Sequence, residues 1–282
     1  MQLISLPKRV LNCGELKLDL SVPHVMGVLN VTPDSFSDGG KFNSLESAIL
    51  RAQEMIEQGA TIIDIGGEST RPGASAVDVY DELDRVIPVV KALAKLNVVI
   101  SIDTSQPEVI IQAVEAGAHI WNDVRALTRP GALETAAKLD IPIIIMHMRG
   151  EPTTMNHLDQ YDDVTLDVIS ELEEKVAAAI KAGVKTENIV IDPGFGFAKN
   201  AQQNLKLLSE FYKLTEMGYP ILSALSRKRF IGEVLGGVDA QDRAVGSVAA
   251  HLMSIQQGAS MVRAHDVKEM VHAIKLWSAI QL

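Results

Sequence analysis

The stretch Ile189 to Asn200, IVIDPGFGFAKN, places a carboxylate where an apolar run ends and the chain turns. Asp192 closes the run, and Pro193, Gly194 and Gly196 follow. A carboxylate at the end of a buried strand is costly unless something pairs with it. A local Asp-Pro-Gly turn would satisfy it. So would a ligand with adjacent N–H groups, because a carboxylate accepts such a pair in bidentate fashion.

Polar residues follow other apolar runs in the same way. The residues at or just after the ends of these runs are Asn30, Glu68, Asp103, Asn122, Asp192, Ser226, Lys228, Arg263 and His265. One such residue would mean little. Because nearly every strand–helix unit contributes one, we predict a common site, built from carboxylates, amides and a small group of cations.

The elements that must position these residues alternate along the chain. Strand cores are expected at Val25–Val31, Thr61–Ile65, Val98–Ile102, His119–Trp121, Pro142–Met146, Ile189–Ile191, Ile221–Leu225 and Ser260–Val262, with amphipathic helical patterns between them. Eight such units predict an α/β fold, a (β/α)8 TIM barrel, whose active site lies at the C-terminal ends of the strands. We predict a single domain over residues 1–282. Within it, residues 1–20 alternate around a turn at Asn12–Gly14 and are expected to form a hairpin that closes the barrel bottom.

A recurring pattern supports the barrel. The segments EQGATIIDIGGE, EAGAHIWNDV and QQGASMVRAHDV each run from a helix end through a Gly-Ala pair into a strand. Gly59, Gly117 and Gly258 are therefore expected to end helices in the left-handed conformation.

Composition limits the partners. The chain has 282 residues, 47% of them hydrophobic, with a net charge of −10 and 4% aromatics. A duplex-binding protein usually carries a basic face, so we expect no nucleic-acid partner. No apolar run reaches the ~18 residues of a membrane span, so we expect no membrane. The lone Cys13 allows no internal disulfide, and MQLISLPKRV lacks the apolar segment of a signal peptide, so we expect a cytoplasmic protein.

The motifs resemble those of the dihydropteroate synthase family. MGVLNVTPDSFSDGG, DIGGESTRPG, SIDTSQP, IWNDV, MHMRGEPTTM, IDPGFGFAKN, LSRKRFIGE and VRAHDV match its blocks in order, from Met26 to Val267. The resemblance implies a barrel enzyme of folate synthesis. Such an enzyme joins a dihydropterin methyl diphosphate to 4-aminobenzoate and releases diphosphate. It also leads us to expect a homodimer with these small molecules as substrates.

Five residues are expected to bind the pterin: Asp103, Asn122, Met146, Asp192 and Lys228. Asp192 would accept the ring N–H and amino group together, with ~1.5–3 kcal/mol for each charge-assisted bond. Asn122 can donate and accept, which suits a mixed pterin edge, although a buried turn cap explains it equally well. Asp103 would face another edge, while Thr104 or Ser105 caps the helix that starts near Pro107. Met146 would supply an apolar wall, and a plain core position is the alternative.

The diphosphate is expected to meet Asn30, Thr70, Arg71, Arg263 and His265. Late barrel loops often bind phosphate, which suits Arg263 and His265. A helix cap is the alternative for His265. The resemblance assigns Asn30 to a magnesium–diphosphate unit. Because Mg²⁺ keeps mostly water and phosphate ligands, one amide contact suffices, so we expect Mg²⁺ as the cofactor.

The remaining substrate, 4-aminobenzoate, is expected to meet Thr70, Arg71, Pro72, Phe197, Ser226 and Lys228. The resemblance places the stem of Lys228 beside the aminobenzoate and Ser226 on its carboxylate. It also makes Asp103, Lys228 and Arg71 the residues that act in catalysis. Arg227, Arg229, Asp64 and His147 are expected to be structural.

One departure from the family pattern and two other functions remain. Ala198 stands where the family commonly has glycine, which puts the backbone beside Phe197 in question. A methyltetrahydrofolate–corrinoid methyltransferase would share the pterin contacts, but should lack ESTRPG and the Lys228–Arg263–His265 set. A non-catalytic pterin-binding paralogue should show damaged loops or lack Lys228.

Overall fold

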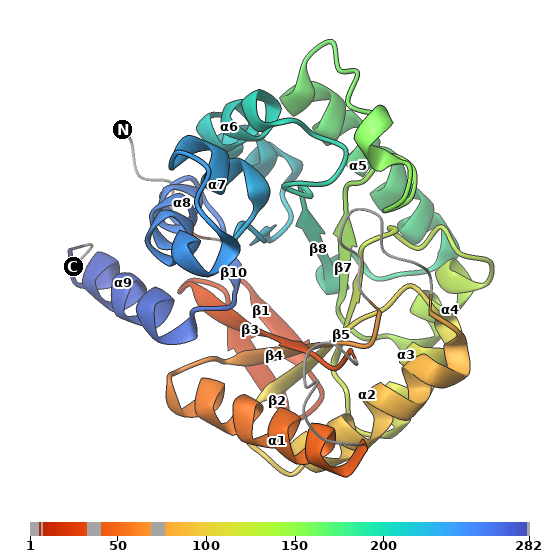
Figure 1. The fold of residues 1–282 in the computed structure, drawn as a ribbon. Helices are drawn as coiled ribbons and strands as arrows, with labels where there is room; N and C mark the ends of the chain where they lie inside the picture. Colours follow the sequence, from red (N-terminus) through yellow and green to blue (C-terminus); the bar gives the residue numbers. More distant parts are fainter. Residues whose placement is uncertain (1–5, 7, 33–40, 69–76, 281–282) are drawn as a thin grey trace.

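The computed structural model describes residues 6, 8–32, 41–68 and 77–280. Its centre is a ring of parallel strands surrounded by helices (Figure 1). The strands of the ring are β3 (His24–Asn30), β4 (Ile62–Gly66), β5 (Val99–Asp103), β6 (Ile120–Asp123), β7 (Ile143–Met146), β8 (Ile189–Asp192), β9 (Leu222–Ser223) and β10 (Met261–Ala264). They pair in the order β8-β7-β6-β5-β4-β3-β10-β9. A bridge between Ile191 and Ile221 joins the two ends, so the sheet closes into the predicted barrel.

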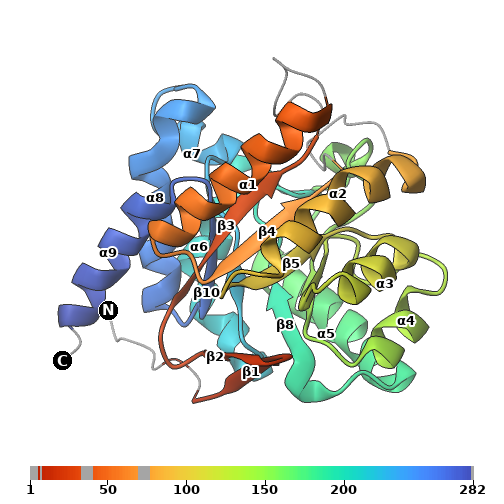
Figure 2. The ribbon, with the colours of Figure 1, turned by 90° about the horizontal axis from the view of Figure 1, so that it is seen from below.

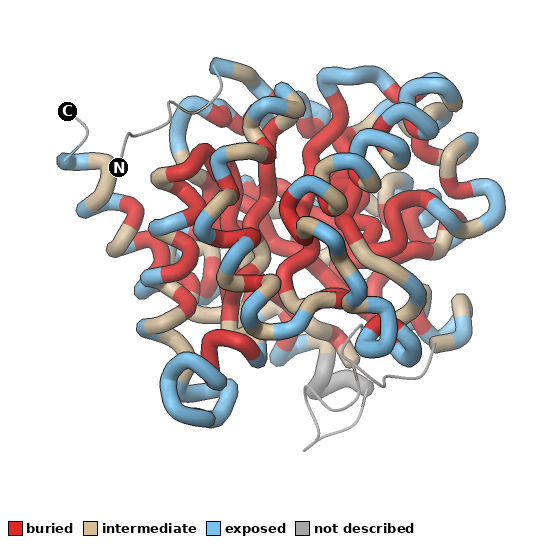
Figure 3. Tube along the Cα trace, turned by 90° about the horizontal axis from the view of Figure 1, so that it is seen from above, coloured by how far each residue is buried: buried red, intermediate tan, exposed pale blue. Residues whose placement is uncertain are grey.

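The helices form the outer layer. They are α1 (Lys41–Glu57), α2 (Val79–Leu93), α3 (Pro107–Glu115), α4 (Ala132–Leu139), α5 (Val164–Ala182), α6 (Ala201–Ser209), α7 (Arg229–Val234), α8 (Ala244–Gln256) and α9 (Val267–Ile280). Short 3-10 helices span Met155–His157, Thr186–Asn188, Phe211–Met217 and Ala240–Arg243. Each helix buries one apolar face on the ring, and burial is concentrated in the strands (Figure 3). Within the ranges described above, no helix is both long and apolar enough to cross a bilayer.

A hairpin closes one end of the barrel. Strands β1 (Val10–Cys13) and β2 (Leu16–Asp19) pair antiparallel and lie below the ring (Figure 2). Leu11, Cys13, Leu18 and Leu20 are buried against residues at the beginnings of the barrel strands, including Met26 and Ile62. The predicted hairpin is confirmed, with its turn at Gly14–Glu15 rather than at Asn12–Gly14. Because this end is plugged, only the opposite end is available for a site.

All eight predicted strands are present, within two residues of the expected starts. The exception in length is β9, which has only two residues instead of five. The expected left-handed conformation is confirmed at Gly59, Gly117 and Gly258, with φ of 104°, 112° and 105°. The expected cap of α3 by Thr104 or Ser105 is wrong. Gln106 occupies the N-cap position without a side-chain bond, and Pro107 at the helix start has no N–H group that would need an acceptor.

Candidate active site

Strand register brings the predicted polar residues into one row. Asn30 of β3 pairs with Gly66 of β4, Gly66 pairs with Asp103 of β5, and Asp103 pairs with Asn122 of β6. On the next two strands, Met146 pairs with Asp192. Parallel strands in register end at the same level, so these side chains share the open end of the barrel. A Cβ on Gly66 would lie 3.6 Å from Oδ1 of Asn30 and 3.7 Å from Oδ2 of Asp103.

Arg263 reaches into this row from β10. Its Nε donates to Oδ2 of Asp64 at 2.6 Å, and its Nη2 donates to Oδ2 of Asp103 at 2.8 Å. The same oxygen of Asp64 accepts from Nδ2 of Asn122 at 3.2 Å. Burial opposes the charge of Arg263, but the two carboxylates outweigh it and raise the pKa of the guanidinium. The row is therefore tied together before any substrate binds.

The two site carboxylates, Asp103 and Asp192, have pKa values raised toward neutral pH. Burial, followed by the nearby Asp64, raises the pKa of Asp103 to about 7 against the opposing charge of Arg263. Burial likewise raises the pKa of Asp192 to about 6, against a backbone hydrogen bond and the charge of Lys228. Such shifts are typical of functional sites.

The local-turn interpretation of Asp192 is confirmed, and the ligand interpretation stays a prediction. Its Oδ1 accepts from the backbone N–H of Gly194 at 2.7 Å, which is the local turn bond. Its other oxygen makes no hydrogen bond with any residue that the structure describes, and can accept from a ligand. The same is true of Oδ1 of Asp103 and Oδ1 of Asn122. Three acceptors with free capacity thus face the open end of the barrel.

Lys228 supplies the cation opposite these acceptors. It precedes α7, and its Nζ lies 4.2 Å from the centre of the Phe197 ring. Burial and the charge of Arg263 lower the pKa of Lys228 to about 8, although Asp192 acts in the opposite direction. Its ammonium has no hydrogen-bond acceptor among the described residues, so its donors remain available. The cation–π contact joins two residues that were both predicted to meet the aminobenzoate.

Ser226 and His265 form a pair. Oγ of Ser226 accepts from the backbone N–H of His265 at 3.1 Å and lies 3.0 Å from Nδ1 of its ring. Burial and the charges of Arg263 and Arg227 lower the pKa of His265 to about 3, so the ring is neutral. Ser226 can donate to Nδ1, which leaves Nε2–H as the donor of His265. His265 would therefore offer a diphosphate a hydrogen bond rather than a charge.

Other predicted residues lie elsewhere. Glu68 directs its carboxylate to the buried Arg125, with Nη1 of Arg125 3.1 Å from Oε2. Arg125 also donates from Nε to Glu151 at 2.7 Å, so it links the segments after β4, β6 and β7. Thr70, Arg71 and Pro72 lie outside the described residues. Arg227 forms the expected structural ion pair, with Asp266.

Sequence reasoning missed one member of the network, Arg125. Asp64 was expected to be a structural hydrogen-bonding carboxylate, and it is: it is fully buried and accepts from Arg263 and Asn122. Its position inside the apolar run IIDIGG was the available signal, since a buried carboxylate requires partners. Arg125 gave no such signal, because its partners Glu68 and Glu151 are distant in sequence.

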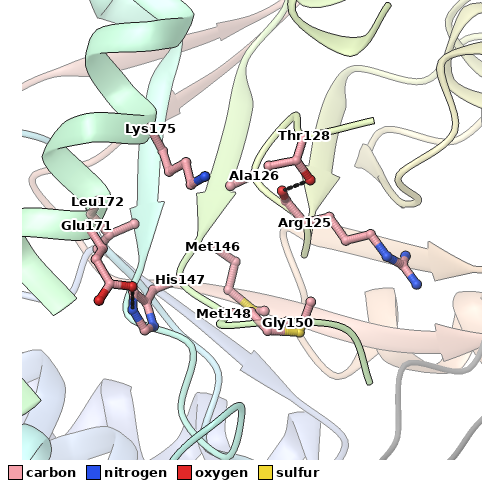
Figure 4. Close-up of a pocket in the computed structure, with 10 residues that line it drawn as sticks. All are labelled: Arg125, Ala126, Thr128, Met146, His147, Met148, Gly150, Glu171, Leu172 and Lys175. Carbon is pink, nitrogen blue, oxygen red and sulfur yellow. Dashed lines mark hydrogen bonds and ion pairs between the residues drawn. The ribbon is translucent and has the colours of Figure 1, made fainter. Parts of the chain in front are cut away.

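A cavity of about 160 Å³ lies beside the row. It is lined by the segments after β6 and β7 and by α5, and Glu171, Lys175 and His147 project toward it (Figure 4). Of the predicted site residues that the structure describes, only Met146 lines it. This cavity is therefore a neighbour of the polar row, with Met146 in the wall between them.

The donor set suits magnesium as a substrate-bound ion. No group of three or more His, Cys, Asp or Glu residues that could hold a metal occurs in the described part of the chain. Asn30 is half-buried at the end of β3 and offers an amide oxygen. Because Mg²⁺ usually binds proteins through one or two side chains and takes its other ligands from water and phosphate, this set fits.

Comparisons with known proteins agree with this geometry. A model of the family described as pterin binding enzyme matches residues 26–265. The dihydropteroate synthase of Escherichia coli K12 is 51% identical over 263 residues, which are 93% of each chain.

Solved structures give the same result. Xanthomonas albilineans dihydropteroate synthase with 4-aminobenzoic acid is 47% identical, with a TM-score of 0.92, covering 98% of this chain and 99% of that chain. The same enzyme in complex with 7,8-dihydropteroate is 44% identical, with a TM-score of 0.88, covering 96% and 98%.

Proposed function

We propose that this chain, which belongs to the pterin binding enzyme family, is a dihydropteroate synthase. It joins (7,8-dihydropterin-6-yl)methyl diphosphate to 4-aminobenzoate, giving 7,8-dihydropteroate and diphosphate. The observation that carries the proposal is the row of Asp103, Asn122 and Asp192 at the strand ends, with Lys228 and Arg263 beside it. The complexes of the Xanthomonas enzyme with 4-aminobenzoic acid and 7,8-dihydropteroate support the same two-substrate reaction.

The pterin would bind in the row. The free oxygens of Asp192 and Asp103 accept its N–H groups, Oδ1 of Asn122 accepts at the same edge, and Lys228 donates to the ring carbonyl. Met146 supplies an apolar wall. Since these groups come from five different strands or loops of a rigid barrel, the pocket is largely preorganised.

The diphosphate would lie toward Arg263, His265 and Asn30. Arg263 uses two of its five N–H donors on Asp64 and Asp103, so the other three remain for the diphosphate. When bound, Mg²⁺ supplies positive charge to the departing diphosphate, and Asn30 is the residue that would hold it. Thr70 and Arg71 are proposed to complete this site.

The aminobenzoate would lie between Phe197 and the stem of Lys228, with Ser226 and the Thr70–Pro72 segment on its carboxylate. The contact between Lys228 and the Phe197 ring supports this placement. The hydroxyl hydrogen of Ser226 is already donated to Nδ1 of His265, so Ser226 would donate to the carboxylate only by giving up that bond.

The reaction would begin with cleavage of the C–O bond. The electron pair leaves with diphosphate, and a cation remains on the exocyclic methylene of the electron-rich dihydropterin. The carboxylates of Asp103 and Asp192 lower the energy of that cation. The arylamine then forms the C–N bond and loses a proton to water.

The state of the two imidazoles supports this order. A direct displacement would benefit from a base on the weakly nucleophilic arylamine. His265 has its Nδ1 engaged by Ser226, and His147 lies between Lys199 and Glu171. Neither imidazole has a free basic nitrogen.

The test is product formation by the purified chain. We expect 7,8-dihydropteroate from the two substrates and Mg²⁺, detected by chromatography, with one diphosphate released for each product. Pterin binding without product would instead favour a non-catalytic paralogue. Methyl transfer to a corrinoid from methyltetrahydrofolate would favour the other pterin-using function. Either result would overturn the proposal.

The proposal includes a homodimer in the cytoplasm. Val234 and Leu235 of α7 and its end, with Val245 and Met253 of α8, are apolar and exposed, and the two helices are neighbours (Figure 1). An exposed apolar face of this kind is typical of an interface. Sedimentation of Val245→Glu should show a monomer where the parent chain is a dimer.

The proposed location is the cytoplasm. The buried thiol of Cys13 is compatible with a reducing compartment, and cell fractionation tests that location.

A further inference from the structure

Lys199 is a buried lysine with three acceptors around its ammonium group. It follows Ala198 in the segment after β8. Its Nζ lies 2.9 Å from Nδ1 of His147, 2.9 Å from the carbonyl oxygen of Gly194 and 3.0 Å from that of Phe197. A protonated amine has three donors, so this arrangement satisfies it completely.

Glu171, which contacts the other ring nitrogen of His147, determines which of the two nitrogens carries the hydrogen. Nε2 of His147 lies 3.0 Å from Oε2 of Glu171, and Glu171 is fixed in turn by Nε of Arg149 at 2.8 Å. A carboxylate held by an arginine only accepts, so Nε2 carries the hydrogen and Nδ1 is left as an acceptor. Lys199 must then be the donor to Nδ1.

The electrostatic surroundings agree with this assignment. Burial and the charge of Lys199 lower the pKa of His147 to about 4, against the pull of Glu171. Burial lowers the pKa of Lys199 to about 7, while Asp192 and Glu171 raise it and Lys228 and Arg149 lower it further. Because the pKa of Lys199 lies above that of His147, a proton between the two resides on Lys199 rather than on the imidazole.

The two carbonyls that Lys199 holds belong to the turn that forms the candidate site. The N–H of Gly194 orients Asp192, and the ring of Phe197 packs under Lys228. The turn also runs directly against β7, because a Cβ on Gly194 would lie 1.9 Å from the carbonyl oxygen of His147. A shift of this turn would move both substrate contacts together.

We propose that Lys199 is a positioning residue: its ammonium group clamps the turn at Gly194 and Phe197 to His147, and so aims Asp192 at the pterin and Phe197 at the aminobenzoate. The clamp continues through Glu171 to Arg149, so the segments after β7 and β8 move as one unit. This inference rests on the proposed function for the identity of the two substrates, but not for the state of the clamp itself.

Kinetics give the first test. Lys199→Met keeps the length of the side chain and removes its donors; Lys206→Met, on the exposed end of an ion pair with Asp163, is the matched control. We expect the KM for 4-aminobenzoate to rise at least tenfold in Lys199→Met and less than twofold in Lys206→Met. A lysine that only supported folding would lower kcat through the active fraction and leave KM unchanged. That result would overturn the proposal.

The imidazole tautomer gives the second test, and it is measured in the parent protein. Nitrogen-15 NMR of the ligand-free parent protein at neutral pH should show Nδ1 of His147 unprotonated and hydrogen-bonded, with hydrogen on Nε2; His147→Gln identifies the signals among the seven histidines. Hydrogen on Nδ1 would mean that Lys199 does not donate to it, and would refute the proposed clamp. Absence of dihydropteroate with the parent chain would refute the proposed function and leave the tautomer result standing.

Discussion

Arg263 and Asp103 are joined across the mouth of the barrel: Nη2 of the arginine on β10 lies 2.8 Å from Oδ2 of the aspartate on β5. The strands that carry them are separated in the sheet by β3 and β4. The pair sets the charge of the site, because the positive charge of Arg263 stabilises the ionised form of Asp103, which burial destabilises. The two carboxylates occupy two of the five N–H donors of Arg263, and the other three are those that the proposed diphosphate would meet.

Removal of Arg263 should therefore have two effects. In Arg263→Ala we expect diphosphate to bind at least tenfold more weakly by calorimetric titration. We also expect the pKa of Asp103 to rise further, since Asp64 then faces it without a counter-charge. Arg229→Ala, whose side chain is 86% exposed, is the control and should bind diphosphate normally. Unchanged binding by Arg263→Ala would exclude this residue from the diphosphate site.

The variant Asp192→Asn should keep the fold and bind pterin more weakly. The substitution retains the bond from Gly194 but replaces an anion by a group that can accept from only one atom. The loss of charge-assisted bonds, at ~1.5–3 kcal/mol each, predicts at least a tenfold weaker affinity. The exposed Asp242→Asn serves as the control. Affinity equal to the parent protein, measured by fluorescence titration, would refute the pterin contact.

Pterin affinity should rise with pH between pH 5 and pH 7.5. The ionised forms of Asp192 and Asp103 accept the pterin N–H groups, and their pKa values are about 6 and about 7.

The same two carboxyl groups affect the stability of the fold. Both pKa values lie above the usual range, so folding favours the protonated forms. Their contribution to the stability of the ligand-free protein is present at low pH and is lost as the pH rises through these values. Asp192→Asn should flatten the lower part of both profiles. Titrations of affinity and of unfolding over this range provide the measurement.

The barrel was predictable because its signals are local. Each strand is a short, mostly apolar run, and several end at a polar residue such as Asp103 or Asp192, which indicates both the strand and the end where the site lies. The short length of β9 was not predictable, because the run Ile221–Leu225 is mostly apolar and only its neighbours decide how many residues pair. The plugging hairpin was predictable from alternation, although its turn begins at Gly14.

The links between the site residues were not predictable. Nothing near Arg263 in sequence indicates that it would pair with Asp64 and Asp103, because the partners are 199 and 160 residues away. The same holds for Lys199 and His147, which are 52 residues apart. Residue types and strand ends identified which side chains meet; only the three-dimensional register shows which atoms are already engaged.

Ala198 tests the one departure from the family pattern. It adopts φ of 48°, a conformation that costs a non-glycine residue roughly 1–2 kcal/mol. Glycine would relieve this strain but lose roughly 0.5–1 kcal/mol in chain entropy and the contacts of a buried methyl group. We expect Ala198→Gly to change stability by less than about 1 kcal/mol, and turnover by less than tenfold, about 1.4 kcal/mol of barrier. Ala126→Gly, which starts from φ of 52°, is the matched control. A larger change in turnover would mean that the methyl group helps to place Phe197.

The order of bond cleavage and bond formation gives the last prediction. If the C–O bond breaks first, the exocyclic methylene becomes trigonal in the transition state, so deuterium there should give a sizeable normal secondary isotope effect on single-turnover chemistry. The same order predicts that 4-aminobenzoate binds well only after the pterin and diphosphate sites are filled, because Phe197 and Lys228 complete its pocket beside the cation. An isotope effect near unity, or tight aminobenzoate binding to the empty protein, would support direct displacement. In that case a base would be needed, and since His265 and His147 have no free basic nitrogen, water would have to accept the proton within the displacement step itself.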